Sequence, residues 1–274
     1  MKLKEALKHE LSPSELEQLV RAYDVIGDLA ITIIPPELRE KEHIIGETIL
    51  RIHKNIKVVA RRDGNYQGEF RTIPLKVIAG ENRKETECRE YGVRLCLNPE
   101  KVYFSVRSGT ERKRLADQVQ PGEEVLVMFS GVGAFPLVMA RNSPSREIVG
   151  IEKNATAHEY AVRNLACNKK IRNVIFLPGD VTEVMPTLGR KFDRLAMPLP
   201  KTGENYLDLA LGVLKPGGWL HFYDFQQKDH FAESVDKVAS AGDRMHRTLI
   251  QSKIIVCGHS GPKTYRICVD GQVE

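Results

Sequence analysis

The chain has 274 residues, of which 42% are hydrophobic and 28% charged, so it can form one large or two modest domains with ample core. Its net charge of +5 permits a polyanionic partner but does not require one. No apolar run reaches the ~18–20 residues of a membrane span, and residues 1–8 lack the apolar core of a secretory signal, so we expect a cytoplasmic protein with no membrane partner.

Short helices are predicted over residues 1–22, where Ser12-Pro13-Ser14-Glu15 is a typical helix start. From residue 23 to 107 the pattern changes to short β-like runs separated by turn residues, with one predicted helix over residues 36–54. The predicted strands cover residues 25–34, 57–61, 72–79, 93–97 and 101–106. Residues 23–107 are therefore expected to form a small α+β domain.

Basic side chains are concentrated in one part of this predicted domain, between residues 51 and 62. They are Arg51, His53, Lys54, Lys57, Arg61 and Arg62. Such a run is either the solvated face of a strand or a patch that contacts phosphates. We take Arg61 and Arg62 as candidate contacts to RNA.

Strands and helices alternate in the rest of the chain, residues 108–274, after a charged helix predicted over residues 108–120. The predicted strands cover residues 124–129, 147–152, 173–177, 192–197 and 217–224, and the predicted helices cover residues 134–141, 156–168, 203–214 and 229–241. This alternation of helices with near-continuous apolar strands is typical of a doubly wound parallel sheet. Two last strands, residues 249–258 and 264–270, predict a closing hairpin.

A two-glycine turn, with Gly131 and Gly133, follows the first of these strands, and Glu152 ends the second. A strand, a glycine turn, a helix and an acid at the tip of the next strand make a nucleotide-binding βαβ unit, in which the carboxylate can bind a ribose diol. The third glycine of the dinucleotide fingerprint GxGxxG is absent, because Ala134 follows Gly133 directly. An NAD-dependent dehydrogenase is therefore the weaker of two readings.

The terminal hairpin separates the two cofactor classes. A hairpin after five alternating strands resembles the seven-stranded, Rossmann-like sheet of class I S-adenosylmethionine-dependent methyltransferases. Asp180 lies just past the third predicted strand, where its carboxylate can accept a hydrogen bond from the adenine amino group. We therefore expect S-adenosylmethionine as the cofactor.

The five cysteines are scattered, odd in number and without C-x-x-C spacing. They are Cys88, Cys96, Cys167, Cys257 and Cys268. We therefore expect reduced thiols and neither a disulfide framework nor a metal site.

Residues from about 66 to 270 resemble the archaeal and eukaryotic tRNA (guanine-N1)-methyltransferases that act next to the anticodon. The matching stretches are Gly68-Glu69-Phe70-Arg71, Ala79-Gly80-Glu81-Asn82, Val102-Tyr103-Phe104-Ser105-Val106-Arg107, Gly109-Thr110-Glu111-Arg112, Met128-Phe129-Ser130-Gly131-Val132-Gly133, Leu199-Pro200-Lys201, Leu214-Lys215-Pro216-Gly217-Gly218 and Gly261-Pro262-Lys263-Thr264-Tyr265-Arg266. The resemblance implies a tRNA methyltransferase acting on N1 of the guanosine 3′ of the anticodon, with the anticodon loop of tRNA as its partner. It implies a small RNA-binding domain before the class I sheet, no DNA partner and a monomer.

Methylation of guanine N1 requires removal of the N1 proton, after which negative charge builds on O6 and needs a donor. By resemblance, Glu111 is the general base and Arg71 the donor near O6. The resemblance also implies two groups of binding residues. For the cofactor these are Arg112, Phe129, Gly131, Gly133, Glu152, Lys153, Asp180, Val181 and Pro198; for the tRNA they are Arg107, Pro200 and Lys201, beside Arg61 and Arg62.

The chain departs from the family pattern at two positions. Pro198 stands where relatives carry the Asn of an Asn-x-Pro motif, and proline has neither a side-chain acceptor nor an N–H. Val127 stands where many relatives have an Asp at the end of the first strand, near the methionine part of the cofactor.

These departures keep other functions open. The chain could act on a wyosine intermediate derived from the same guanine, by methyl transfer or by the aminocarboxypropyl transfer of wybutosine synthesis. It could also be a tRNA-binding relative with decayed activity. The Leu199-Pro200-Lys201 segment favours the methyltransferase, and Arg71, Glu111, Glu152 and Asp180 argue against decay.

Overall fold

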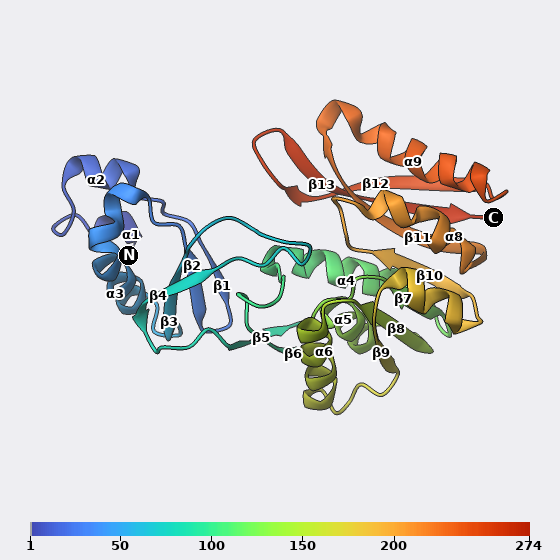
Figure 1. The fold of residues 1–274 in the computed structure, drawn as a ribbon, viewed down its shortest axis with the longest axis horizontal. Helices are drawn as coiled ribbons and strands as arrows, with labels where there is room; N and C mark the ends of the chain where they lie inside the picture. The colour runs from blue at the N-terminus through green and yellow to red at the C-terminus, as the bar shows by residue number, and fades with distance from the viewer. Residues whose placement is uncertain (1) are drawn as a thin grey trace. The chain divides into compact units, whose positions relative to one another are not determined.

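The computed structural model describes residues 2–274, which form two compact units (Figure 1). The first comprises the chain up to Glu90 together with Arg94–Val106, and the second comprises Tyr91–Val93 and Arg107–Glu274. Apart from Tyr91–Val93, the two units therefore meet in the sequence between Val106 and Arg107. Within residues 2–274, no helix is both long and apolar enough to cross a membrane.

A four-stranded sheet with the order β1-β2-β3-β4 organises the first unit. Its strands are β1 (Tyr23–Ile26), β2 (Leu29–Thr32), β3 (Val58–Arg62) and β4 (Leu75–Gly80), and only β2 and β3 are parallel. The single strand predicted over residues 25–34 is therefore wrong. It divides at Gly27, whose φ of +59° makes a turn. A Cβ there would lie 2.1 Å from the carbonyl oxygen of Glu87, so only glycine fits.

Helices on this sheet form one hydrophobic core with it. They are α1 (Leu3–Ala6), α2 (Pro13–Gln18), the 3-10 helix η1 (Pro36–Lys41) and α3 (Glu42–Ile52). The predicted start at Ser12 is confirmed, because Ser12 and Glu15 form a capping box at α2. Leu3, Leu7 and Leu11 are buried in the same core as α3, so residues 2–22 fold as part of the first unit.

A small ribbon of two strands, β5 (Thr86–Glu90) and β6 (Val93–Leu97), follows the sheet. The strand β5 was not predicted. The strand predicted over residues 101–106 is wrong, because the carbonyl of Asn98 accepts the N–H groups of Lys101 and Val102 and closes a turn instead. The segment then enters the 3-10 helix η2 (Val106–Ser108).

A seven-stranded sheet with the order β12-β13-β11-β10-β7-β8-β9 forms the second unit, as the class I methyltransferase resemblance predicts. Its strands are β7 (Glu124–Val127), β8 (Glu147–Glu152), β9 (Val174–Pro178), β10 (Phe192–Met197), β11 (Leu214–Gln227), β12 (Leu249–His259) and β13 (Thr264–Val273). Strands β7 to β11 are parallel, and β13 runs antiparallel to both of its neighbours. The predicted closing hairpin is β12–β13.

Helices cover both faces of this sheet (Figure 1). One face carries α4 (Gly109–Gln118), α5 (Ala134–Asn142) and α6 (Ala155–Cys167). The other carries α7 (Val181–Val184), the 3-10 helices η3 (Met185–Leu188) and η4 (Gly203–Tyr206), α8 (Leu207–Gly212), η5 (Lys228–His230) and α9 (Phe231–Arg244). The apolar core of this second face includes Leu195, Met197, Leu220, Phe222 and Val269.

Residues between these apolar positions point to the face covered by α4, because side chains alternate along a strand. Several of them are polar and buried, namely Arg194, His221, Tyr223, Cys268 and Asp270. His221 lies opposite Asp270 in the ladder between β11 and β13, and Tyr223 lies opposite Cys268. The sheet register therefore gathers a polar layer beneath α4.

Candidate active site

A turn with left-handed backbone joins β7 to α5. Phe129, Gly131 and Gly133 have φ values of +57°, +59° and +83°. A Cβ at Gly133 would lie 2.6 Å from the ring of Phe176, so this position requires glycine for packing as well as for φ. The sheet order reverses between β7 and β10, and open α/β sheets bind ligands at such a switch point, outside the carboxyl ends of the strands.

Glu152 is held beside this turn at the end of β8. Its Oε2 accepts the Gly131 N–H at 2.6 Å, and its Oε1 accepts the Asn154 N–H at 2.8 Å. Burial raises the pKa of Glu152, and hydrogen bonds from the backbone of Asn154, Gly131 and Lys153 oppose the rise. A carboxylate has about four acceptor positions, so capacity remains for a ribose hydroxyl.

An unmet hydrogen-bonding group lies in the same turn. The Oγ of Ser130 is buried and has no hydrogen-bond partner among residues 2–274. A buried polar atom normally has a partner. Ser130 and the remaining acceptor capacity of Glu152 thus fit the polar adenosine part of S-adenosylmethionine.

Asp180 follows β9 and caps the short helix α7. Its Oδ1 accepts the backbone N–H and the hydroxyl of Thr182 at 2.9 and 2.7 Å, and its Oδ2 pairs with Lys153 at 3.0 Å. The bonds from Thr182 and the charge of Lys153 lower the pKa of Asp180. Lys153, predicted as a cofactor contact, orients Asp180 here, and Val181 next to it is buried.

Pro198 lies in the loop after β10, at the position where the methyltransferases that the sequence resembles carry an Asn side chain. The neighbouring carbonyl of Met197 accepts the Leu199 N–H at 2.7 Å, and that of Ala196 accepts the Met128 N–H at 2.9 Å. Pro198 therefore gives this loop shape without supplying a hydrogen bond. Pro200, further along the loop, is half-buried.

Glu111 projects from α4 into the polar layer and is only 5% exposed. Arg114 donates to both of its oxygens, at 2.8 Å from Nε and 2.6 Å from Nη2, and the Tyr223 hydroxyl donates at 2.6 Å. Burial alone would raise the pKa of Glu111, but the hydrogen bonds and charge of Arg114 outweigh it and lower the pKa. The predicted base is thus a buried, ionised and paired carboxylate.

Arg114 is shared with a second carboxylate, Asp270 of β13, through both of its terminal nitrogens. Asp270 also lies 2.6 Å from Nδ1 of His221. On the other side of that ring, Nε2 lies 2.8 Å from a terminal nitrogen of Arg194. Arg194 in turn donates to both oxygens of Glu123, at 2.7 and 3.0 Å. A continuous line of hydrogen bonds therefore crosses the sheet from Glu123 to Glu111.

Three side chains in this layer, His221, Cys268 and Asp270, have ligand atoms within 4.8 Å of one another, as a metal site requires. Both ring nitrogens of His221 already take part in hydrogen bonds. The guanidinium groups of Arg114 and Arg194 on either side would repel a cation. This geometry fits a hydrogen-bond network better than a metal centre.

Two arginines near Glu111 differ in their surroundings. Arg112 is 3% exposed, and its guanidinium lies 5.6 Å from the centre of the Phe135 ring. Arg107 is exposed in η2, and Lys201 is exposed after β10. Arg107 and Lys201 are therefore accessible to an RNA backbone, whereas Arg112 is not.

Arg71 belongs to the first unit, at the tip of a tight hairpin closed by Gln67 and Thr72. Its φ of +50° is uncommon for a residue with a side chain. The guanidinium lies 5.1 Å from the centre of the Tyr103 ring and 5.7 Å from that of Tyr66. Both tyrosines are exposed, so Arg71 is presented on an open aromatic platform.

The two arginines predicted to contact RNA from β3 lie in different environments. Arg61 is 5% exposed, and Glu42 and Asp63 each accept a hydrogen bond of 2.5 Å from it. The assignment of Arg61 as an RNA contact is therefore corrected: its charge stabilises the first unit internally. Arg62 pairs with Asp24 at 3.2 Å and lies 5.7 Å from the centre of the Tyr66 ring.

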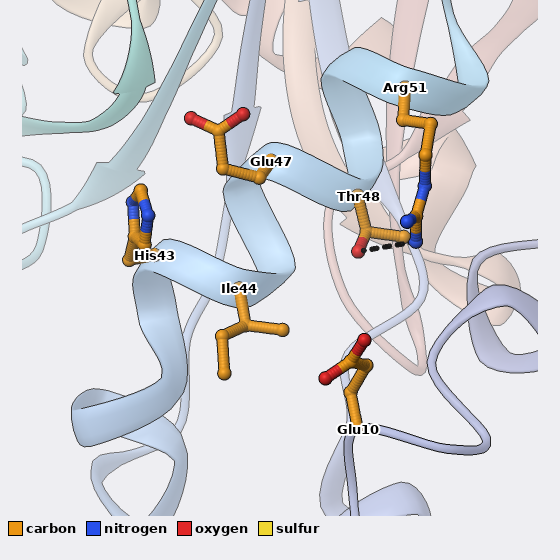
Figure 2. A pocket seen from close by; sticks show the side chains of 6 residues that line it. All are labelled: Glu10, His43, Ile44, Glu47, Thr48 and Arg51. Carbon is orange, nitrogen blue, oxygen red and sulfur yellow. Dashed lines mark hydrogen bonds between the residues drawn. The ribbon is translucent and has the colours of Figure 1, made fainter.

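A pocket of about 320 Å³ lies beside α3 in the first unit (Figure 2). Its lining residues are Glu10, His43, Ile44, Glu47, Thr48 and Arg51. The guanidinium of Arg51 donates to the Thr48 hydroxyl at 3.3 Å, and Glu10 and Glu47 add two carboxylates to the lining. None of the predicted site residues lines this pocket.

Four members of this network, Arg114, His221, Asp270 and Arg194, were not predicted from the sequence. For His221 and Asp270 the signal is a polar side chain at every second position of an otherwise apolar strand, as in Leu220-His221-Phe222-Tyr223 and Cys268-Val269-Asp270. Such alternation ordinarily indicates a strand with one solvated face. Only the position of α4 over that face makes the layer a buried network.

Comparison with known proteins identifies related families. Residues 86–250 match the TRM5/TYW2 methyltransferase domain, and residues 3–83 match the TYW2 N-terminal domain. The chain is 35% identical over 265 residues to the tRNA (guanine(37)-N(1))-methyltransferase Trm5b of Pyrococcus abyssi, covering 96% of this chain and 78% of that protein.

Two further relatives bear on substrate and partner. The tRNA(Phe) (4-demethylwyosine(37)-C(7)) aminocarboxypropyltransferase of Methanocaldococcus jannaschii is 30% identical over 255 residues, covering 92% of this chain and 98% of that protein. A solved complex of aTrm5 with tRNALeu superimposes with a TM-score of 0.84 at 30% identity, over all of this chain and 78% of that one.

We expect Glu152→Gln to lower the free energy of unfolding by about 1–3 kcal/mol, because the amide must turn its NH2 toward a backbone N–H. Binding of S-adenosylmethionine should weaken in parallel. Chemical denaturation and calorimetry measure the two effects. Glu159→Gln, at an exposed position of α6, is the matched control. Unchanged stability in Glu152→Gln would contradict the buried hydrogen bonds assigned to it.

Proposed function

Because this chain belongs to the TRM5/TYW2 methyltransferase family, we propose that it transfers a methyl group from S-adenosylmethionine to N1 of the guanosine 3′ of the tRNA anticodon. The observation that carries the proposal is the similarity to Trm5b over 96% of the chain. We expect the protein to act as a monomer on the anticodon loop.

The second unit supports binding of this cofactor. Gly131 and Gly133 shape the turn after β7, Glu152 has acceptor capacity for a ribose hydroxyl, and Ser130 offers a buried hydroxyl. Asp180, fixed by Thr182, is available to orient the adenine. When bound, S-adenosylmethionine supplies an electrophilic methyl group on a positively charged sulfonium.

Glu111 is proposed to take the proton from guanine N1, which makes the N1 lone pair available to the methyl group. Its lowered pKa keeps it ionised at neutral pH, so it can accept a proton there. Ionised Glu111, the form that can act as a base, predominates above this pKa. Activity is therefore expected to fall as the pH drops through the pKa of Glu111. A low pKa also makes Glu111 a weak base, so its surroundings must help the transfer.

Arg71 is proposed to donate a hydrogen bond to guanine O6, where negative charge accumulates once N1 loses its proton. The strained hairpin tip and the two tyrosine rings limit the conformations of its guanidinium. The exposed ring of Tyr66 also offers a surface for base stacking. We propose that residues 23–107 grip the tRNA, with Arg62, Arg107 and Lys201 as phosphate contacts.

A specific observation favours a second candidate. Residues 3–83 match the TYW2 N-terminal domain, and one relative transfers an aminocarboxypropyl group to a wyosine nucleoside. Both reactions use the same cofactor but break different bonds to its sulfur. The group found on the nucleoside therefore decides between them.

We expect the protein, incubated with doubly labelled S-adenosylmethionine and an unmodified tRNA transcript, to form N1-methylguanosine. Mass spectrometry of digested nucleosides identifies both the group and the modified atom. A transcript with adenosine 3′ of the anticodon is the control and should remain unlabelled. An aminocarboxypropyl adduct, or product only with wyosine-containing tRNA, would favour the second candidate.

Glu111→Gln should lower the single-turnover rate by roughly 10²- to 10⁴-fold, the usual contribution of a general base. Cofactor affinity, measured by calorimetry, should change little. Asp117→Asn removes an exposed acid from the same helix and should leave the rate unaltered. If the rate of folded Glu111→Gln equals that of the wild type, Glu111 is not the base.

Arg71→Ala should reduce kcat/KM by an amount equivalent to about 2–4 kcal/mol, the effect of losing one donor to a developing negative charge. Arg89→Ala, at a side chain 80% exposed in β5, is the control for a lost positive charge. Steady-state kinetics with tRNA separates kcat from KM. A change in KM alone would make Arg71 a tRNA anchor.

A further inference from the structure

Two buried carboxylates compete for one guanidinium in the second unit. Arg114 donates to both oxygens of Glu111 and to both oxygens of Asp270. Glu111 is 5% exposed and Asp270 is 4% exposed, so solvent screens neither pair effectively. A proton that is transferred to Glu111, Arg114 and Asp270 binds to one of the two carboxylates.

The donors around the carboxylates are unequal. Glu111 receives hydrogen bonds from Arg114 and Tyr223, and the thiol of Cys257 also faces it. Asp270 receives them from Arg114, from Gln118 at 3.1 Å, from the Cys268 thiol at 3.3 Å and from His221 at 2.6 Å. The additional donors stabilise the ionised form of Asp270 more strongly. In agreement, the pKa of Asp270 is lowered further than that of Glu111.

His221 can act only as a donor toward Asp270. A guanidinium cannot accept a hydrogen bond, so Arg194 must donate to Nε2 of the ring. The lone pair of Nε2 is thereby occupied, the ring proton sits on Nδ1, and His221 is neutral. Complete burial and the nearby arginines lower the pKa of His221, which agrees with this tautomer.

We propose that Arg194, His221 and Asp270 are positioning residues that assign the transferred proton to Glu111. The proposal rests on the function proposed above. Arg194 fixes the tautomer of His221, His221 keeps Asp270 ionised, and Asp270 anchors Arg114. When a proton is transferred, Glu111 is then the carboxylate that accepts it and loses its ion pair with Arg114.

The charges balance in each state. Before transfer, Glu111, Arg114 and Asp270 carry a net charge of −1. When the N1–H bond of guanine breaks and the proton moves to Glu111, the group becomes neutral and Arg114 remains paired with Asp270. Without Asp270, protonation of Glu111 would leave a buried guanidinium unpaired, which is strongly unfavourable.

Titratable and charged groups reach Glu111 from each element that packs against it. These are Arg114 from α4, Tyr223 from β11, Cys257 from β12 and Cys268 from β13, while Asp270 of β13 acts on Glu111 through the shared Arg114. Burial raises the pKa of the Tyr223 hydroxyl and of both thiols, so these three stay neutral at physiological pH. Arg114 and Asp270 are therefore the charged groups that set the protonation of Glu111.

The order of titration tests the proposal without any assay of activity. In the full-length protein labelled with ¹³C at glutamate and aspartate carboxyl carbons, NMR should show Glu111 titrating at higher pH than Asp270. Glu111→Gln and Asp270→Asn assign the two resonances. The reverse order in the wild type would overturn the proposal, whatever the substrate.

Variants test the direction of each effect. Asp270→Asn should move the Glu111 titration to lower pH, whereas Tyr223→Phe should move it to higher pH. His221→Leu should raise the pH at which Asp270 titrates. His221→Asn, whose amide N–H replaces Nδ1–H, should return that pH toward the wild-type value. A Glu111 titration that is the same in folded Asp270→Asn as in the wild type would overturn the proposal.

The pH dependence of the single-turnover rate links the network to chemistry. In Asp270→Asn the acid limb of the pH–rate profile should move to lower pH, as the NMR titration of Glu111 does. The rate on the pH-independent plateau should fall about tenfold. A plateau loss with an unmoved limb would make Asp270 merely structural. If the wild type transfers no methyl group although the titration order holds, the proposed function fails, and with it the role of the network in proton transfer.

Discussion

The ion pairs of Arg114 with Glu111 and Asp270 are the constraint on which the second unit depends. Through this guanidinium, helix α4 is attached to β13, while Tyr223 attaches it to β11. The arrangement is costly, because three charged groups are withdrawn from water, and removal of Arg114 would leave two buried carboxylates without a counter-charge. It fixes Glu111, the proposed base, more firmly than a surface residue could be fixed.

The cofactor turn illustrates a different principle, in which packing determines the backbone. Gly133 is required by Phe176 and by its own positive φ, and Glu152 ties the turn to β8. The strands and the turn therefore hold each other, so the proposed cofactor site is shaped by contacts within the protein. Pre-organisation of this kind reduces the ordering that binding must otherwise impose.

Much of the second unit could be predicted from the sequence, because strong apolar periodicity and the glycine turn are local signals. The first unit was harder to predict. Gly27 divides one apolar run into two strands only because Glu87 lies against it, and Arg61 is internal only because Glu42 and Asp63 accept its hydrogen bonds. Arg114 lies one helical turn from Glu111, but Tyr223 and Asp270, the other members of its hydrogen-bond network, lie more than a hundred residues away in the chain and could not be foreseen.

The line of charges from Glu123 to Glu111 has a consequence for temperature. The hydration of ions becomes less favourable on heating, so the penalty for withdrawing these groups from water falls as the temperature rises. Apolar packing gains no comparable advantage per unit area. The polar layer beneath α4 therefore accounts for a growing share of the stability of the second unit under hot conditions.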